Sequence, residues 1–320
     1  SGAPGATAAR ATSAPAGAAA ALGGLLLVAA GVHALSWSTY RRLLASPLAG
    51  SARETRIQSA LWTRGVPGLS AAASAVAMAE VRLALRTPRG RIMLMMPLVL
   101  LVVFSLPMLT GREGLSFGDN AIESGLGLGL VVAVFGLAGL GPIALNQFAV
   151  DGAGLTLQLL APIPDRDVLR GKAAGLALIG GAPILAGLGV AAAVFPPASP
   201  SLWLALLAGT LAAFFVLSPL WALVSATFPR AASLNSVRSA ASNPHPAANF
   251  IGLGALVGAA APPAGLAALA IGMFDRPDLV LPLVGLWCVA AYLIGRLLFV
   301  PATAAFTRRR ENLVMVAQGR

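Results

Sequence analysis

Seven long apolar runs divide the chain, at residues 16–35, 92–110, 125–145, 173–195, 202–226, 251–274 and 279–300. Each has roughly the 20 residues that an α-helix needs to cross about 30 Å of hydrocarbon. Only the last run contains a Lys, Arg, Asp or Glu, which is Arg296. Arg296 lies four residues from the end of its run, so its side chain can reach the membrane interface, and we interpret it as an anchor. The pattern predicts an all-α polytopic membrane protein with about seven transmembrane helices.

Composition excludes a single soluble domain. Hydrophobic residues make up 58% of the 320 residues and charged residues only 10%, against about 25% charged residues in an ordinary soluble domain. The net charge of +11 alone would suggest a nucleic-acid partner. The cations follow the segments between the apolar runs instead of one domain, so we expect no nucleic-acid partner.

The charges between the runs predict the orientation of the chain. Their sums alternate along the sequence: +7 for 36–91, −2 for 111–124, zero with three cations for 146–172, none for 196–201, +2 for 227–250, −1 for 275–278 and +3 for 301–320. Basic loops stay on the cytoplasmic side of a membrane. We therefore expect a multi-pass protein of the cell inner (plasma) membrane whose C-terminus is cytoplasmic.

The segment 70–91 has the pattern of a helix that lies on a membrane surface. On a helical wheel its apolar arc includes Leu85, whereas Glu80, Arg82 and Arg86 lie outside that arc. A proline two residues after Arg86 ends the helix and directs the chain into the next span. An ordinary basic stop before a transmembrane helix is the alternative interpretation.

The cytoplasmic segment 146–172 predicts a compact apolar element between two spans. Asp151 can cap a short helix at about 153–160, and Asp165 can cap the helix that re-enters the membrane. The leucines of this short helix are too few to cross a bilayer, yet too many for a simple linker. We expect another surface to cover Leu155, Leu157, Leu159 and Leu160.

The order of these segments resembles the ABC type-2 permease family. The resemblance covers residues of about 70–320. It rests on an amphipathic helix that ends in Arg86-Thr87-Pro88-Arg89, on the six spans that follow, and on the stretch from Asp151 to Lys172 between the second and third of them. It implies an elbow helix at 70–91 and a six-helix transmembrane domain at 92–300.

The resemblance also implies functional residues. The loop 146–172 would couple to a separate ATPase subunit, and the residues assigned to this coupling are Asp151, Gly152, Gly154, Leu155, Leu157, Leu160, Asp165, Arg166 and Asp167. Glu80, Arg82 and Arg86 would belong to the elbow helix. For the charged residues after Pro164, a solvated helix start is an alternative that explains them nearly as well.

The remaining segments extend beyond the six-span pattern. We interpret 1–15 as a flexible lead, 16–35 as an extra transmembrane helix, 36–69 as a cytoplasmic connector and 301–320 as a basic cytoplasmic tail. If the extra helix is the last span of an earlier half, the complete protein fuses two halves. Otherwise the second half of the transporter would be another copy of this chain or a second permease.

The chain lacks the motifs of nucleotide and metal chemistry. Around Gly171-Lys172, Arg166 stands where a phosphate-binding loop requires glycine, and Ala173 stands where it requires Ser or Thr. The two histidines, His33 and His245, have no Cys or Glu at ligand spacing. We therefore expect no catalytic, cofactor-binding or metal-binding residue in this chain, with ATP bound and hydrolysed on the partner subunit.

These expectations favour a membrane-spanning permease subunit of an ATP-driven transporter, and the resemblance implies an exporter. Its expected partners are a nucleotide-binding ATPase subunit, a second permease half and membrane lipids. An ion-coupled secondary transporter is the alternative, because Pro262-Pro263 would divide the run 251–274 into half-helices whose carbonyl groups could bind an ion. An intramembrane enzyme and a non-transporting membrane subunit are further alternatives. An apolar path would suit a lipid-like, amphiphilic or peptide cargo.

Overall fold

A computed structural model describes residues 65–109, 116–117, 120–121, 125–194, 199–232 and 244–318. The helices are α3 (Ala71–Arg86), α4 (Pro88–Leu109), α5 (Gly125–Ala144), η1 (Ala149–Asp151), α6 (Ala153–Leu160), α7 (Asp165–Val194), α8 (Pro200–Thr227), α9 (Pro246–Ala268), η3 (Leu269–Met273), η4 (Pro277–Leu279), α10 (Val280–Arg308) and α11 (Arg310–Ala317). The predicted lead, the extra helix at 16–35 and the connector up to residue 64 lie outside the described residues.

Within the described part of the chain, six helices are long and apolar enough to cross a membrane. They are α4, α5, α7, α8, α10, and α9 together with the π-helix η3. The bundle leaves large apolar side chains on its surface, among them Phe250, Leu286 and Leu297. Such side chains match lipid hydrocarbon and not water. The protein is therefore a helical multi-pass membrane protein, and six of the seven predicted spans are confirmed as helices.

The chain divides into two compact units. One contains residues 103–123, in which the strands β1 (Ser116–Phe117) and β2 (Asn120–Ala121) pair in antiparallel fashion. The other contains residues 63–102 and 124–320 and is called the bundle here. All side chains discussed below belong to the bundle.

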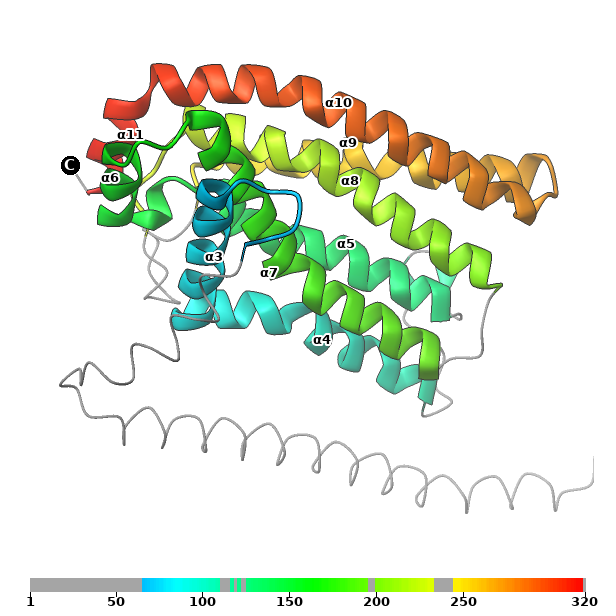
Figure 1. Cartoon of the computed structure of the whole chain (residues 1–320). Helices are drawn as coiled ribbons and strands as arrows, with labels where there is room; N and C mark the ends of the chain where they lie inside the picture. Colours follow the sequence, from blue (N-terminus) through cyan, green and yellow to red (C-terminus); the bar gives the residue numbers. More distant parts are fainter. Residues whose placement is uncertain are drawn as a thin grey trace, which may run out of the picture. The chain divides into compact units, whose positions relative to one another are not determined.

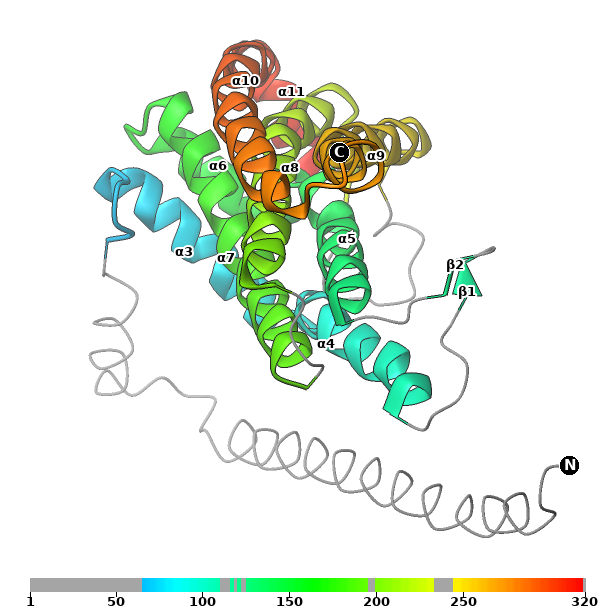
Figure 2. The same cartoon turned by 90° about the vertical axis from the view of Figure 1, so that its right-hand side faces the viewer.

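Helix α8 is central in the bundle, because it packs against α5, α7, α9 and α10. Figure 2 looks along these helices, and Figure 1 views them from the side. The main core lies where α5, α7 and α8 meet and includes Leu140, Ile179 and Leu217. Glycine permits close contact between α8 and α10, since a Cβ atom at Gly295 would collide with the carbonyl group of Phe215.

Helix α3 is confirmed as a helix, but it buries a different face from the one predicted. It begins after Ser70, whose hydroxyl accepts a hydrogen bond from Ala73 N at 3.1 Å, and it ends at Arg86. The buried face carries small side chains and Glu80, whereas Leu85 is 46% exposed. The helical wheel predicted the wrong buried face because α7 approaches α3 closely, and small side chains permit that approach better than leucine.

The prediction that Pro262 and Pro263 divide a span is wrong. Both prolines lie inside the continuous helix α9, which runs from Pro246 to Ala268 and passes into η3. Helices in a bundle tolerate proline where neighbouring helices support them. Pro263 is buried against Gly209 of α8. The helix is therefore not broken at this position.

Candidate functional site

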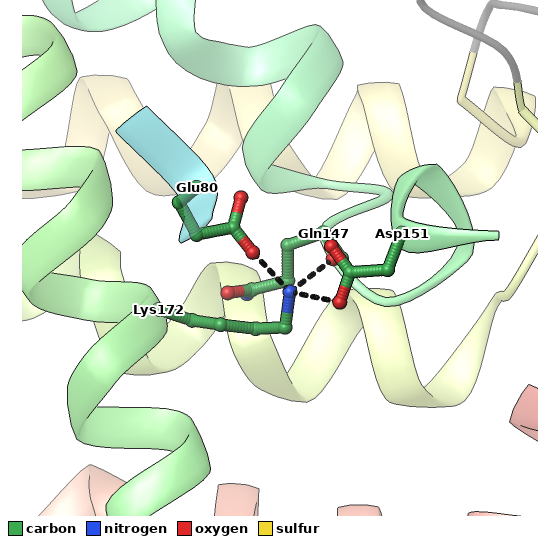
Figure 3. A network of polar contacts seen from close by, with 4 residues as sticks. All are labelled: Glu80, Gln147, Asp151 and Lys172. Carbon is green, nitrogen blue, oxygen red and sulfur yellow. Dashed lines mark hydrogen bonds and ion pairs between the residues drawn. The ribbon is translucent and has the colours of Figure 1, made fainter. Parts of the chain in front are cut away.

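A buried lysine joins three segments of the bundle. Lys172, in the third turn of α7, donates hydrogen bonds to Glu80 of α3, to Asp151 Oδ2 of η1 at 2.7 Å and to the carbonyl oxygen of Gln147 at 2.7 Å. Both carboxylates form ion pairs with its ammonium group. Figure 3 shows these residues converging on Nζ. The Lys172 side chain is only 1% exposed, so this group is called the buried ion cluster.

Two glycines of α7 make the cluster possible. A Cβ atom at Gly171 would lie 2.6 Å from the carbonyl oxygen of Ala73, and one at Gly175 would lie 2.6 Å from the Cβ atom of Glu80. Gly171 and Gly175 are four residues apart and share one helix face. This spacing of small residues brings helix backbones into close contact, and it places Glu80 beside Lys172.

The cluster holds two carboxylates and one ammonium group away from water. Burial raises the pKa of Glu80 from its ordinary value of 4.5 to about 7, and the neighbouring Asp151 carboxylate also raises it. The positive charge of Lys172 acts in the opposite direction, but it is shared between both acids. Glu80 therefore gains or loses a proton close to neutral pH.

Several polar atoms around the cluster have no hydrogen-bond partner among the described residues. They are Glu80 Oε2, both side-chain amide atoms of Asn146 and Gln147 Nε2. Each buried polar atom without a partner costs about 1–3 kcal/mol. Three of these four atoms belong to the loop after α5, directly beside the ion pair.

An aromatic contact connects the cluster to the C-terminal helices. The Lys172 ammonium group lies 5.7 Å from the ring centre of Phe148, which in turn stacks on Phe306 of α10 at 4.7 Å. Leu155 of α6 and Leu313 of α11 are buried in the same apolar group. Helices α6 and α11 therefore lie together at one end of the bundle, called the α6 end (Figure 1).

Helix α6 occupies the predicted range, but its residues have different environments. Leu155 is fully buried within the bundle, where Phe148 and Phe306 cover it instead of the outside surface that was expected. Leu157 and Leu160 are 70% and 78% exposed. Asp151 does not cap α6: Gly152 does, with a φ of 55°, and the Asp151 carboxylate binds Lys172. Gly154 lies half-buried in the first turn.

The charged residues at the start of α7 fasten that helix to its neighbours. The Asp165 carboxylate accepts a hydrogen bond from Thr307 at 2.7 Å and lies 3.6 Å from Arg310. Asp167 accepts a hydrogen bond from Ser70 at 2.8 Å. These two acids therefore connect α7 to α10, α11 and the start of α3. Arg166 is exposed and lines a separate cleft, described below.

The predicted elbow residues do not form one group. Glu80 belongs to the buried ion cluster, Arg82 is half-buried, and Arg86 is exposed in the last turn of α3. Thr87 then adopts an extended conformation and α4 begins at Pro88, as expected for a proline at the first helical position. The structure thus brings Glu80 together with Asp151, two residues that the sequence assigned to different elements.

Sequence reasoning missed the role of Lys172 and the contribution of Gln147. One signal was available, since Lys172 is the only lysine among 22 basic residues and lies between two glycines of a close-packing pattern. Its partners are 92 and 21 residues away in sequence, which no local pattern reveals.

Across the described ranges, no group of three His, Cys, Asp or Glu side chains is placed to hold a metal ion.

Comparisons with known proteins give no assignment for this chain. No protein-family model matches it, and neither a curated protein nor a solved structure matches it. Functional inference therefore rests on the sequence and on the geometry described above.

Proposed function

We propose that this chain is the membrane-spanning permease subunit of an ATP-driven transporter, and that α6 is the element that contacts a separate ATPase subunit. The observation that carries the proposal is the pair Leu157 and Leu160, which stand exposed at the α6 end of the bundle beyond the apolar helices. Two exposed leucines on one face of a short helix favour contact with another protein.

The mechanical connections of α6 support this role. Leu155 and Leu159 anchor its inner face in the cluster with Phe148 and Phe306, and Gln318 donates a hydrogen bond to Thr156 at 3.2 Å. The buried ion cluster joins the segment just before α6 to both α3 and α7. A movement of α6 would therefore be transmitted to α3, α7 and α10 together, because these contacts connect α6 and the segment before it to all three helices.

An apolar cavity supports a lipid-like or amphiphilic cargo. Its volume is about 420 Å³, within the range of small-molecule sites. It lies between α5, α8, α9 and α10, and Leu137, Leu206, Pro263 and Val284 are among its lining residues. Thr210 is the one polar side chain of the lining, and its hydroxyl already donates to the carbonyl oxygen of Leu206. We propose outward transport of such a cargo.

The coupling proposal is tested by co-purification of this chain with the nucleotide-binding subunit that the proposal requires. We expect Leu157→Asp and Leu160→Asp to abolish retention of that subunit and stimulation of its ATPase activity, since a carboxylate would be buried in the contact. Leu157→Met and Leu160→Met are the matched controls, because they keep an apolar side chain at each position. Normal assembly of both Asp variants would refute the role of α6.

The proposed orientation needs a separate test. In a Cys288→Ala background, cysteines placed at Ser199 and at Leu157 are exposed at opposite ends of the bundle. We propose that the α6 end is cytoplasmic, so a membrane-impermeant thiol reagent added to intact cells should label position 199 and not position 157. The reverse pattern would show that the charge-based orientation is inverted.

A proton-coupled secondary transporter is the second candidate function. It is favoured by the buried ion cluster, in which a carboxylate with a pKa of about 7 lies beside a helix that crosses the membrane. Reconstituted vesicles distinguish the two candidates. A carrier would move cargo in response to a pH gradient without ATP, whereas the proposed permease requires the ATPase subunit and ATP.

A further inference from the structure

A large open cleft lies between the first turns of α7 and the second half of α10. Its volume is about 1240 Å³. Two arginines of α7, Arg166 and Arg170, line one wall, and Arg296 and Arg308 of α10 line the other. This arginine cleft is separate from the buried ion cluster and from α6, and Arg166 is its one residue that was also assigned to the coupling loop.

The cleft is strongly positive. No acidic side chain lines it, and within the described ranges none of its four arginines forms an ion pair. The two nearest acids in sequence are already engaged, because Asp165 binds Thr307 and Arg310, and Asp167 accepts a hydrogen bond from Ser70. Four unpaired guanidinium groups around one opening attract an anion, and arginine is well suited to phosphate.

Another part of the lining of the same cleft is apolar. Leu293, Leu297 and Val300 line it, and Leu297 is 72% exposed. Arg296 lies over the ring of Tyr292, with 6.0 Å between its guanidinium carbon and the ring centre. On α10, Arg308 is 12 residues beyond Arg296, or about 18 Å along the helix axis. Along α10 the lining thus passes from a largely apolar stretch that contains Arg296 to the cationic Arg308, and this is the direction in which a membrane changes from hydrocarbon to headgroup.

We propose that the arginine cleft is a binding site for an anionic phospholipid. The lipid phosphate lies between Arg170 and Arg296, Arg166 and Arg308 extend the positive field around the headgroup, and one acyl chain covers Leu293, Leu297 and Val300. A phosphate and a hydrocarbon chain together fit both halves of the lining. The proposed lipid site does not depend on the proposed transport function.

Other occupants fit the lining less well. An acidic soluble protein would neutralise the arginines but would leave the leucines of a membrane-spanning helix uncovered. A second copy of this chain, placed by two-fold symmetry, would bring the same four arginines against each other. Charge complementarity therefore favours the lipid.

The proposal is tested by native mass spectrometry of the purified chain in detergent. Phosphatidylglycerol is titrated against phosphatidylcholine with the same acyl chains, and inorganic phosphate is added as a competitor. We expect the wild-type chain to prefer phosphatidylglycerol. Arg170→Gln with Arg296→Gln should weaken that binding roughly 25-fold, about a factor of five for each arginine near a headgroup. Arg166→Gln with Arg308→Gln is a second pair that tests the outer part of the cleft.

A control pair separates this site from general attraction to basic surfaces. Arg86→Gln with Arg276→Gln removes the same charge from exposed positions outside the cleft and should leave the lipid preference unchanged. Melting temperatures in detergent identify any variant that does not fold. Equal binding by the wild type and both cleft pairs would overturn the proposal. Displacement of the lipid by millimolar phosphate would show a site for the free anion, and a change of oligomeric state without a change in lipid binding would show an interface between copies.

Discussion

Lys172 of α7 forms a buried ion pair with Glu80 of α3, across 92 residues of sequence. The same ammonium group also holds Asp151, which lies two residues before α6. Removing ions from water is expensive, and such a pair persists only where further hydrogen bonds support it. Here the carbonyl oxygen of Gln147 supplies one. The cluster therefore fixes how three segments are positioned relative to one another more than it adds net stability.

Loss of the lysine should destabilise the bundle strongly. Lys172→Met leaves two carboxylates buried without a cation, and we expect a loss of about 3–5 kcal/mol in unfolding free energy, measured by denaturant unfolding in detergent. Adding Glu80→Gln and Asp151→Asn should restore much of that loss, because no buried charge then remains. Arg276→Met is the matched control, since its ion pair with Asp278 is exposed, and it should leave the midpoint unchanged. Equal midpoints for Lys172→Met and Arg276→Met would contradict the buried ion pair.

Stability should decrease as the pH rises from about 4.5 to about 7. Burial raises the pKa of Glu80 to about 7 in the folded chain, above its ordinary value of 4.5. Between these two pH values the folded state binds a proton that the unfolded state has lost. The stabilising contribution of Glu80 to the free energy of unfolding is therefore complete below pH 4.5 and is lost as the pH rises through 7. The slope reaches at most about 1.4 kcal/mol per pH unit for one proton. Unfolding midpoints across this range measure it, and Glu80→Gln should remove this component while Glu311→Gln keeps it.

Close packing between α3 and α7 should depend on the absence of a side chain at Gly171. Gly171→Ala places a methyl group 2.6 Å from the carbonyl oxygen of Ala73, and overpacking of this kind costs about 1–3 kcal/mol. Gly181→Ala, on the same helix, meets no atom within 4 Å and should be neutral or slightly stabilising. Thermal melting in detergent compares the two. Similar melting temperatures would mean that α3 does not rest on α7 as described.

The two faces of α6 should respond differently to truncation. Leu155→Ala removes a fully buried side chain and should lower the unfolding free energy by about 2–5 kcal/mol. Leu157→Ala removes an exposed one and should leave stability of the isolated chain unchanged. Denaturant unfolding of both variants measures the difference. A larger loss for Leu157→Ala would reverse the orientation of this helix, and it would also remove the observation on which the coupling proposal rests.

Local patterns predicted much of the helical architecture. The six described apolar runs are helices because each has enough consecutive apolar residues to satisfy its backbone internally within lipid. The turn at Thr87 and Pro88 was also predictable, since proline acts within a few residues, and the short helix has the predicted bounds of 153–160 although Asp151 does not cap it. The double proline of α9 was misleading, because support from α8 is a property of the neighbouring helix and not of the run itself.

The sequence alone determined that this chain crosses a membrane several times as helices, because hydrophobicity and backbone satisfaction are counted residue by residue. Only the tertiary structure decided which face of α3 is buried, that Leu155 points inward while Leu157 and Leu160 point outward, and that the single lysine binds two distant carboxylates. The buried ion cluster and the arginine cleft arise where helices meet. The energy of a charge there depends on which groups the packing brings within a few ångströms, and separation along the chain carries no information about that.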